Sequence, residues 1–148
     1  MKLNLPQAQF KTRTRNNNIE LWDEFRSRYV KITPEEWVRQ HFLLFLKNQL
    51  GYPGSLISVE KEIKINNLSR RYDAVAYNKL GKPAVLMEFK AQNIKITQKV
   101  LEQIALYNLP LKVSYLIVSN GLSHYCLQFN QTKNQYEQNE DIPPFGIL

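Results

Sequence analysis

Two apolar, strand-like stretches joined by a short turn-prone segment constrain the fold of this chain more than any other feature. The segment between them, Asn78–Pro83, contains asparagine, glycine and proline, which are residues that favour tight turns. A hairpin centred between Leu80 and Gly81 sets Asp73 directly opposite Glu88. The sequence therefore predicts two carboxylates on one face of an antiparallel strand pair.

Directly opposed carboxylates destabilise a sheet. Their Cβ atoms lie about 5 Å apart, and at an effective dielectric constant of about 20 the charges repel by roughly 3 kcal/mol. A divalent cation such as Mg²⁺ or Mn²⁺ removes this repulsion, because hard ions bind carboxylate oxygens and water. Strand side chains alternate between faces, so Lys90 shares the face of Glu88 while Phe89 points to the other. An ammonium group beside a bound cation suits metal-assisted phosphodiester hydrolysis.

The Glu88–Lys90 triplet on its own carries little information, because Glu-x-Lys triplets are common in a chain that is 22% charged. Residues Glu62–Lys64 form a second such triplet, which lacks an aspartate at hairpin spacing. A solvated strand end or a surface ion pair explains either triplet taken alone. The addition of Asp73 in register is what favours a metal site.

Further motifs follow in a recognisable order. They are Pro34–Gln40, Arg71–Asp73, Glu88–Ala91, Gln103 with Tyr107, and Ser119–Gly121. In this order the chain resembles the PD-(D/E)xK nuclease superfamily and, within it, the nuclease domain at the N-terminus of type I restriction enzyme R subunits. The resemblance extends from about Thr33 to Cys126 and departs from the literal motif at Tyr72, which stands in the place of proline.

The resemblance implies an α/β fold, a restriction-endonuclease-like mixed β-sheet core flanked by helices on both faces. It also implies an Mg²⁺-dependent DNA endonuclease, with Mn²⁺ able to substitute. Asp73 and Glu88 are then the expected metal ligands, the Phe89 carbonyl is a candidate to complete the metal shell, and Lys90 is the expected catalytic lysine.

A helix is predicted between Thr33 and Gly51. Thr33 is an N-cap residue, Pro34 follows it at the first helical position, and Glu36 stands in the capping-box position. The resemblance suggests that an acid on this helix reaches the metal, and Glu36 fits that catalytic role better than Glu35 does. Capping alone also explains Glu36, so both interpretations stay open.

Alternating apolar residues predict a strand at 57–65, and a nearly continuous apolar run predicts a buried strand at 113–118. A second helix should begin after Thr97. It connects the strand that ends near Lys90 with the strand at 113–118, and a helical crossover of this kind makes the two strands parallel. Gln103 and Tyr107 share one face of this helix. In the resembled family such a pair is a substrate-side element, although a helix packed on a sheet can carry both for no such reason.

The net charge of +7 and the isoelectric point near 9.5 favour a polyanionic partner. Between Lys61 and Lys99, nine basic residues surround the acidic site against three acidic ones. The candidate contacts to a DNA backbone are Arg70, Arg71, Lys79, Lys82, Lys95 and Lys99. Ordinary solvation of strand and loop ends explains any one of these lysines equally well.

A length of 148 residues fits one compact domain, which we expect at residues 33–148 after an N-terminal arm at residues 1–32. We expect Met1–Asn18 to be poorly ordered and the acidic segment after Asn134 to form an edge strand or tail. One cysteine, Cys126, excludes an internal disulfide, and the absence of a membrane-length apolar segment favours a cytoplasmic location.

The sequence contains no phosphate-binding loop, so translocation on DNA would need a motor from elsewhere. Helicase and specificity subunits of a restriction system are accordingly expected partners, and cutting both strands of a duplex would be consistent with a homodimer. Two alternatives to an enzyme stay open. One is a catalytically silent DNA-binding or subunit-docking module on the same scaffold, and the other is a small housekeeping fold whose basic charge only aids solubility.

Overall fold

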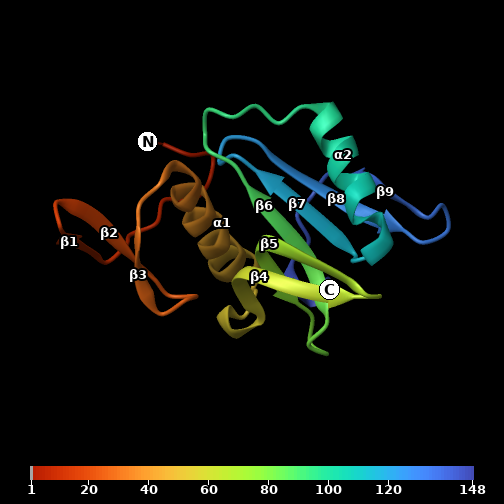
Figure 1. The fold of residues 1–148 in the computed structure, drawn as a ribbon, viewed down its shortest axis with the longest axis horizontal. Helices are drawn as coiled ribbons and strands as arrows, with labels where there is room; N and C mark the ends of the chain where they lie inside the picture. Colours follow the sequence, from red (N-terminus) through yellow and green to blue (C-terminus); the bar gives the residue numbers. More distant parts are fainter. Residues whose placement is uncertain (1) are drawn as a thin grey trace.

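The computed structural model describes residues 2–148, so Met1, the first residue of the predicted arm, lies outside the described residues. The chain forms a six-stranded mixed sheet, a separate three-stranded antiparallel sheet and two α-helices (Figure 1). The small sheet contains β1 (Thr12–Arg15), β2 (Asn18–Asp23) and β3 (Arg28–Lys31). The large sheet contains β4 (Ile57–Ile65), β5 (Leu68–Tyr77), β6 (Pro83–Phe89), β7 (Tyr115–Ser119), β8 (His124–Asn130) and β9 (Gln135–Asn139). The helices are α1 (Pro34–Leu50) and α2 (Gln98–Asn108).

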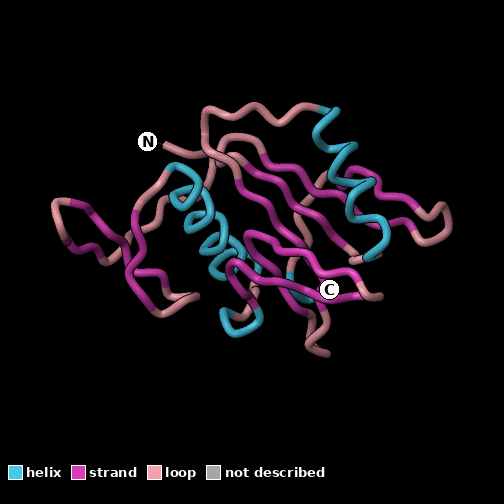
Figure 2. Tube along the Cα trace, in the orientation of Figure 1, coloured by secondary structure: helices cyan, strands magenta, loops and turns pink. Residues whose placement is uncertain are grey.

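The strands of the large sheet lie in the order β4-β5-β6-β7-β8-β9. Neighbours are antiparallel except β6 and β7, which are parallel and are connected through α2 and a long preceding loop (Figure 2). The segment after Asn134 forms β9 at one edge of the sheet, as predicted.

The two helices pack on opposite faces of the large sheet. Phe42 of α1 belongs to a buried cluster with Ala74 and Met87, whereas Ile104 of α2 packs against a second cluster that contains Leu86. The predicted α/β class, a mixed sheet with helices on both faces, is confirmed. In the described part of the chain, neither helix has the length and apolar character that a membrane crossing requires.

Both helices begin at the predicted threonines. Thr33 Oγ1 accepts a hydrogen bond from the Glu36 N–H at 3.1 Å, and Thr97 Oγ1 accepts one from the Val100 N–H at 3.2 Å. Helix α1 ends at Gly51, whose φ of 76° is the left-handed conformation that glycine adopts readily. Local capping chemistry therefore set these boundaries, which is why the sequence predicted them.

Within the predicted N-terminal arm, the strands β1, β2 and β3 form a sheet of their own. Asn16 and Asn17 both have positive φ, 52° and 62°, and close a two-residue hairpin turn of the kind that asparagine favours. Leu21 and Val30 lie on one face of this sheet, and both side chains are buried. The prediction of poor order is therefore wrong for Thr12–Asn18.

Gly121 lies in the turn between β7 and β8 at a φ of 87°, and a Cβ there would stand 2.8 Å from Leu3 Cδ2. Gly81, in the turn between β5 and β6, has a φ of 75° and no atom within 4 Å of such a Cβ. We expect Gly81→Ala to lower the free energy of unfolding by about 1 kcal/mol and Gly121→Ala by about 2–4 kcal/mol, since only the second adds crowding to backbone strain. Urea denaturation of both variants tests this difference, and equal losses would contradict it.

Candidate active site

The hairpin of β5 and β6 has the predicted register. Ala74 lies opposite Met87 and Val75 lies opposite Leu86. The ladder ends at the Ala74–Met87 pair, so Asp73 and Glu88 are the next residues along each strand. The two carboxyl groups therefore lie where the strands cease to be hydrogen-bonded, at the carboxyl end of β6.

Asp73 joins the two strands beyond the last ladder pair. Its Oδ2 accepts a hydrogen bond from the Phe89 N–H at 2.7 Å, and Phe89 packs in the core against Phe42 at a centroid distance of 5.3 Å. The carboxylate thus satisfies a backbone donor that the ladder would otherwise have paired. Within residues 2–148, Asp73 Oδ1 makes no hydrogen bond or ion pair, so it is available to a ligand.

Glu88 interacts electrostatically with Asp73 and with Lys90, the two residues predicted to share its site. Burial raises the pKa of Glu88, the charge of Asp73 raises it further, and the charge of Lys90 lowers it. The backbone N–H of Lys90 donates to the Ser119 carbonyl at 2.9 Å, which ties the end of β6 to β7. The structure therefore brings Asp73, Glu88 and Lys90 to one locality, although the assignment of their roles stays a prediction.

The neighbouring strand β4 is irregular at the same level. Glu60 has a φ of 52°, which is uncommon for a residue other than glycine. The pairing of β4 with β5 omits Glu60 and Asp73, although residues on both sides of them are paired. Backbone strain of this kind costs roughly 1–3 kcal/mol and is concentrated at functional sites in proteins. Its coincidence with Asp73 supports a functional role for this part of the sheet.

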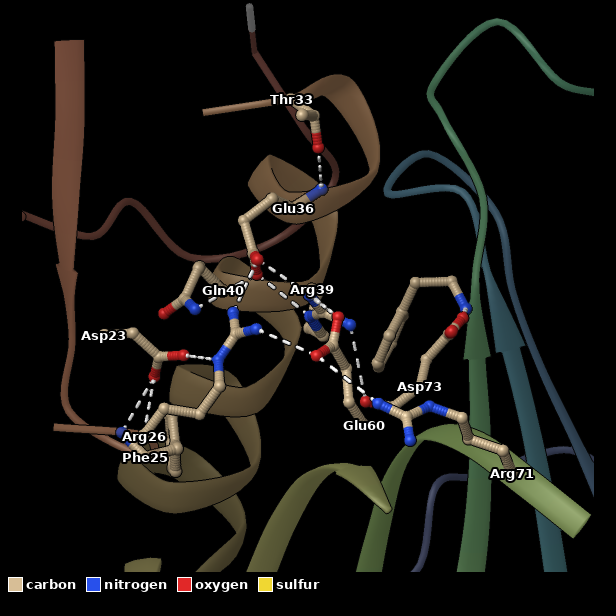
Figure 3. Close-up of polar contacts among 11 residues, drawn as sticks. Asp23, Phe25, Arg26, Thr33, Glu36, Arg39, Gln40, Glu60, Arg71 and Asp73 are labelled. Carbon is tan, nitrogen blue, oxygen red and sulfur yellow. Dashed lines mark hydrogen bonds and ion pairs between the residues drawn. The ribbon is translucent and has the colours of Figure 1, made fainter. Parts of the chain in front are cut away.

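A buried ion-pair network occupies the α1 side of this locality (Figure 3). Glu36 Oε1 accepts from Arg26 at 2.5 Å and from Arg39 at 2.7 Å, while Oε2 accepts from Arg39 Nε at 2.9 Å and from Gln40 at 3.2 Å. Burial opposes ionisation of Glu36, but the hydrogen bonds from Arg39 and Arg26 outweigh it, so the pKa of Glu36 lies below its usual range. Both oxygens of Glu36 are therefore engaged by the protein itself.

The network links the small sheet to the irregular part of β4 at Glu60. Arg26 also pairs with Asp23, and both arginines approach Glu60, at 3.6 Å and 3.7 Å (Figure 3). Arg39 reaches the Asp73 carbonyl oxygen at 3.5 Å. Glu36 thus contacts the neighbourhood of Asp73 through Arg39, and its predicted direct contact with a metal is not tested by this arrangement.

A polar cavity of about 540 Å³ lies against these residues. Asp73 and Phe89 line it together with Glu36 and Arg39, and Arg28 and Lys31 of β3 line it as well. Glu88 and Lys90 do not line this cavity. Asp73 is therefore the predicted metal ligand that connects the Glu88 locality with the cavity on the α1 side.

Arg70 and Tyr107 form one unit at the end of α2. The Arg70 guanidinium lies 3.9 Å from the centroid of the Tyr107 ring and donates to the Tyr107 carbonyl. Burial raises the pKa of Tyr72 to about 12, and the charges of Arg70 and Glu88 both act on this phenol. The Arg70–Tyr107 unit therefore lies on the Glu88 side of the site, and Gln103 is exposed on the same helix.

The other predicted DNA contacts are spread more widely. Arg71 is exposed and pairs with Glu60 at 3.7 Å, and Lys95 and Lys99 are exposed in the loop before α2 and in its first turn. Lys79 and Lys82 lie in the turn at the opposite end of the β5–β6 hairpin from Asp73. At about 3.3 Å per residue, that separation is on the order of 15–20 Å, so the structure does not bring these two lysines to the site.

Sequence reasoning missed Arg26, Arg39 and Glu60 as members of the site. The three-residue spacing of Glu36 and Arg39 on one helix was a readable signal of an ion pair. No comparable signal existed for Arg26, because its contacts with α1 and β4 depend on how the small sheet docks.

The carboxylates present fit a hard divalent cation. Among residues 2–148, no three His, Cys, Asp or Glu side chains are grouped closely enough to hold a metal ion. Mg²⁺ commonly needs only one or two carboxylates, with water and substrate phosphate supplying the other ligands. The two adjacent acids and the unengaged Asp73 Oδ1 match that requirement.

The mixed sheet has a helix on each face, and Asp73 and the Glu88–Lys90 triplet lie at the ends of two adjacent strands, an arrangement that suggests a nuclease-like module. The chain belongs to the family of the type I restriction enzyme R protein N terminus, whose model matches residues 34–143. The predicted resemblance is confirmed. No match to a curated protein was found.

Proposed function

We propose that this chain is a metal-dependent DNA endonuclease that hydrolyses phosphodiester bonds at Asp73, Glu88 and Lys90. The observation that carries the proposal is the end of the β5–β6 ladder, where two interacting carboxyl groups and an ammonium group meet. Such a combination is unfavourable for stability, because burial and the charge of Asp73 both oppose ionisation of Glu88. A bound cation would remove that cost.

In this proposal Asp73 and Glu88 hold Mg²⁺ or Mn²⁺, and the Phe89 carbonyl is a further candidate ligand. The cation, when bound, supplies Lewis-acid activation of water and of the phosphate. Lys90 stabilises negative charge that develops on the phosphate, since its ammonium group lies close enough to Glu88 to shift that pKa. Arg70, whose guanidinium lies over the Tyr107 ring, is a proposed contact to a backbone phosphate, and Gln103 is a proposed substrate contact on the helix that carries Tyr107.

Family membership places the chain in the context of a restriction system. DNA is the proposed substrate, and helicase and specificity subunits are the proposed protein partners. Arg71, Lys95 and Lys99 are exposed next to the site or along the loop leading to α2, so they remain proposed backbone contacts. Lys79 and Lys82 can contact only DNA that extends along the hairpin to its turn.

Incubation of the purified chain with supercoiled plasmid tests the proposal. We expect nicked or linear product with Mg²⁺ or Mn²⁺ and none in excess EDTA, because the two carboxylates need the cation to act. Gel electrophoresis measures the product. Cleavage that persists in EDTA would contradict metal dependence, whereas DNA binding without cleavage under any cation would instead support a binding or docking module.

A further inference from the structure

We propose that the outer face of the β1–β2–β3 sheet binds the phosphate backbone of DNA and leads it to the cavity at Asp73. This sheet precedes the residues that the family model matches, 34–143, so the family does not account for it. The proposal shares its ligand with the proposed function, but it does not require that the chain cleave that ligand.

The strand register assigns side chains to the two faces of the sheet. Trp22 lies opposite Tyr29. The backbone N–H of Trp22 donates to the Lys11 carbonyl at 2.7 Å, so these three residues form one row across the sheet. Arg13 and Lys31 both lie opposite Glu20 and form a second row on the same face. The residues between these rows, Leu21 and Val30, are buried, so the face with the two rows is the outer one.

The outer face is strongly basic. It carries Lys11, Arg13, Arg15 and Lys31 against one carboxylate, Glu20, which pairs with Arg13 at 2.7 Å. In the described part of the chain, Lys11, Arg15 and Lys31 form no ion pair, and all three are exposed. Three uncompensated cations within one small sheet form a site for a polyanion.

Aromatic rings contact two of the four basic residues of the outer face, Arg13 and Lys11. The Arg13 guanidinium lies 4.1 Å from the centroid of Tyr29, and Lys11 Nζ lies 6.0 Å from the centroid of Trp22. Trp22 is 37% exposed and contacts Tyr29 edge to face. Cations that are already ordered on rings lose less conformational freedom when they bind phosphate. Basic residues interleaved with aromatic ones favour nucleic acid over an acidic protein surface.

The same sheet is continuous with the candidate active site. Lys31, in the outer row, also lines the cavity that Asp73 and Phe89 line, and so does Arg28 of the same strand. On the inner side, Arg26 connects the sheet to Glu36 and Glu60. A DNA backbone that follows the basic residues of the outer face therefore reaches the cavity at Lys31, and it passes one carboxylate, Glu20, which already pairs with Arg13.

Fluorescence anisotropy with a labelled 30-base-pair duplex in EDTA tests the proposal on the full chain. The outer-face variant carries Lys11→Gln, Arg15→Gln and Lys31→Gln. The control variant removes the same charge with Lys64→Gln, Lys112→Gln and Lys133→Gln, all exposed lysines. The turn that carries Lys133 lies at the opposite end of the molecule from the small sheet (Figure 1). Thermal melting verifies that both variants fold.

We expect the outer-face variant to bind DNA about tenfold to a hundredfold more weakly than the wild type. The slope of log affinity against log salt concentration should become less steep by about two to three, because three phosphate-binding charges are removed. The control variant should retain most of the affinity and the slope. Unchanged binding by the outer-face variant, equal losses in both variants, or no DNA binding by the wild type would each overturn the proposal.

Plasmid cleavage, measured beside duplex binding in EDTA for the wild type and the outer-face variant, separates this proposal from the proposed function. If the wild type binds through the outer face and never cleaves DNA, the surface stands and the nuclease proposal fails. If it cleaves DNA with no contribution from the outer face, the surface proposal fails alone.

Discussion

Replacing Asp73 by asparagine or Lys90 by methionine is expected to slow plasmid cleavage by at least about a hundredfold, because each change removes charge from the site of bond breaking. Asp73→Asn removes a metal-binding anion, so it should also weaken Mn²⁺ binding. Lys90→Met removes the ammonium group while keeping an unbranched side chain, so Mn²⁺ binding should persist. Initial rates on plasmid and calorimetric titration with Mn²⁺ measure the two effects.

The choice of asparagine at position 73 follows from the hydrogen bond to Phe89. Asp73 Oδ2 satisfies the Phe89 N–H at 2.7 Å, and an asparagine oxygen can accept the same bond. Alanine would leave a buried donor unpaired at a cost of about 1–3 kcal/mol. Loss of activity in Asp73→Ala would therefore mix instability with lost chemistry, whereas Asp73→Asn isolates the charge.

The second Glu-x-Lys triplet supplies a matched control. Glu62→Gln and Lys64→Met make equivalent changes at exposed positions of β4, where Lys64 lies 3.8 Å from Glu62. These variants should cleave plasmid at close to the wild-type rate. Full activity in both Asp73→Asn and Lys90→Met, or equal losses in the control variants, would contradict the assigned site.

The hairpin register was predictable because local rules determine it. Side chains alternate along a strand, so a one-residue slip would move core residues such as Leu86 and Met87, which pack on opposite faces of the sheet, to the wrong faces. Asn78 reinforces the turn, since its side-chain oxygen accepts from the N–H groups of Leu80 and Lys82, at 2.9 Å and 3.1 Å. The threonine caps were predictable for the same reason, because each acts within one helical turn.

The network around Glu36 was not predictable by such rules. Its capping position is a local feature, and the Glu36 N–H does bond to Thr33 as expected. The Glu36 carboxylate binds Arg26, which lies ten residues earlier in the chain. Arg26 reaches Glu36 only because the small sheet docks on α1. The small sheet itself left a signal in Asn16 and Asn17, since paired asparagines between extended segments favour a hairpin turn.

Glu36→Ala is expected to lower the free energy of unfolding at pH 7 by about 3 kcal/mol, because removal of one member of a buried ion network leaves charged partners inadequately compensated. Arg26 and Arg39 are 12% and 11% exposed in their side chains, so water can do little to replace the lost carboxylate. Urea denaturation measures the loss. Glu35→Ala provides the control, since Glu35 is an exposed neighbour in the same helical turn and should cost no more than about 0.5 kcal/mol.

The loss should also depend on pH in a defined direction. The pKa of Glu36 is lower in the folded chain than in the unfolded one, so its ionised form stabilises the fold above the unfolded pKa, at about pH 4.3. That contribution declines as pH falls through the folded pKa. The stability gap between wild type and Glu36→Ala should therefore narrow in acid, and a gap that stayed constant would show that lost packing, rather than lost charge, explains it. Titration of a folded Glu36→Gln variant with Mn²⁺ then tests the metal-ligand role left open for this residue. Loss of a direct ligand would weaken cation binding sharply, whereas unchanged binding would leave Glu36 with its role in the cap and the arginine network.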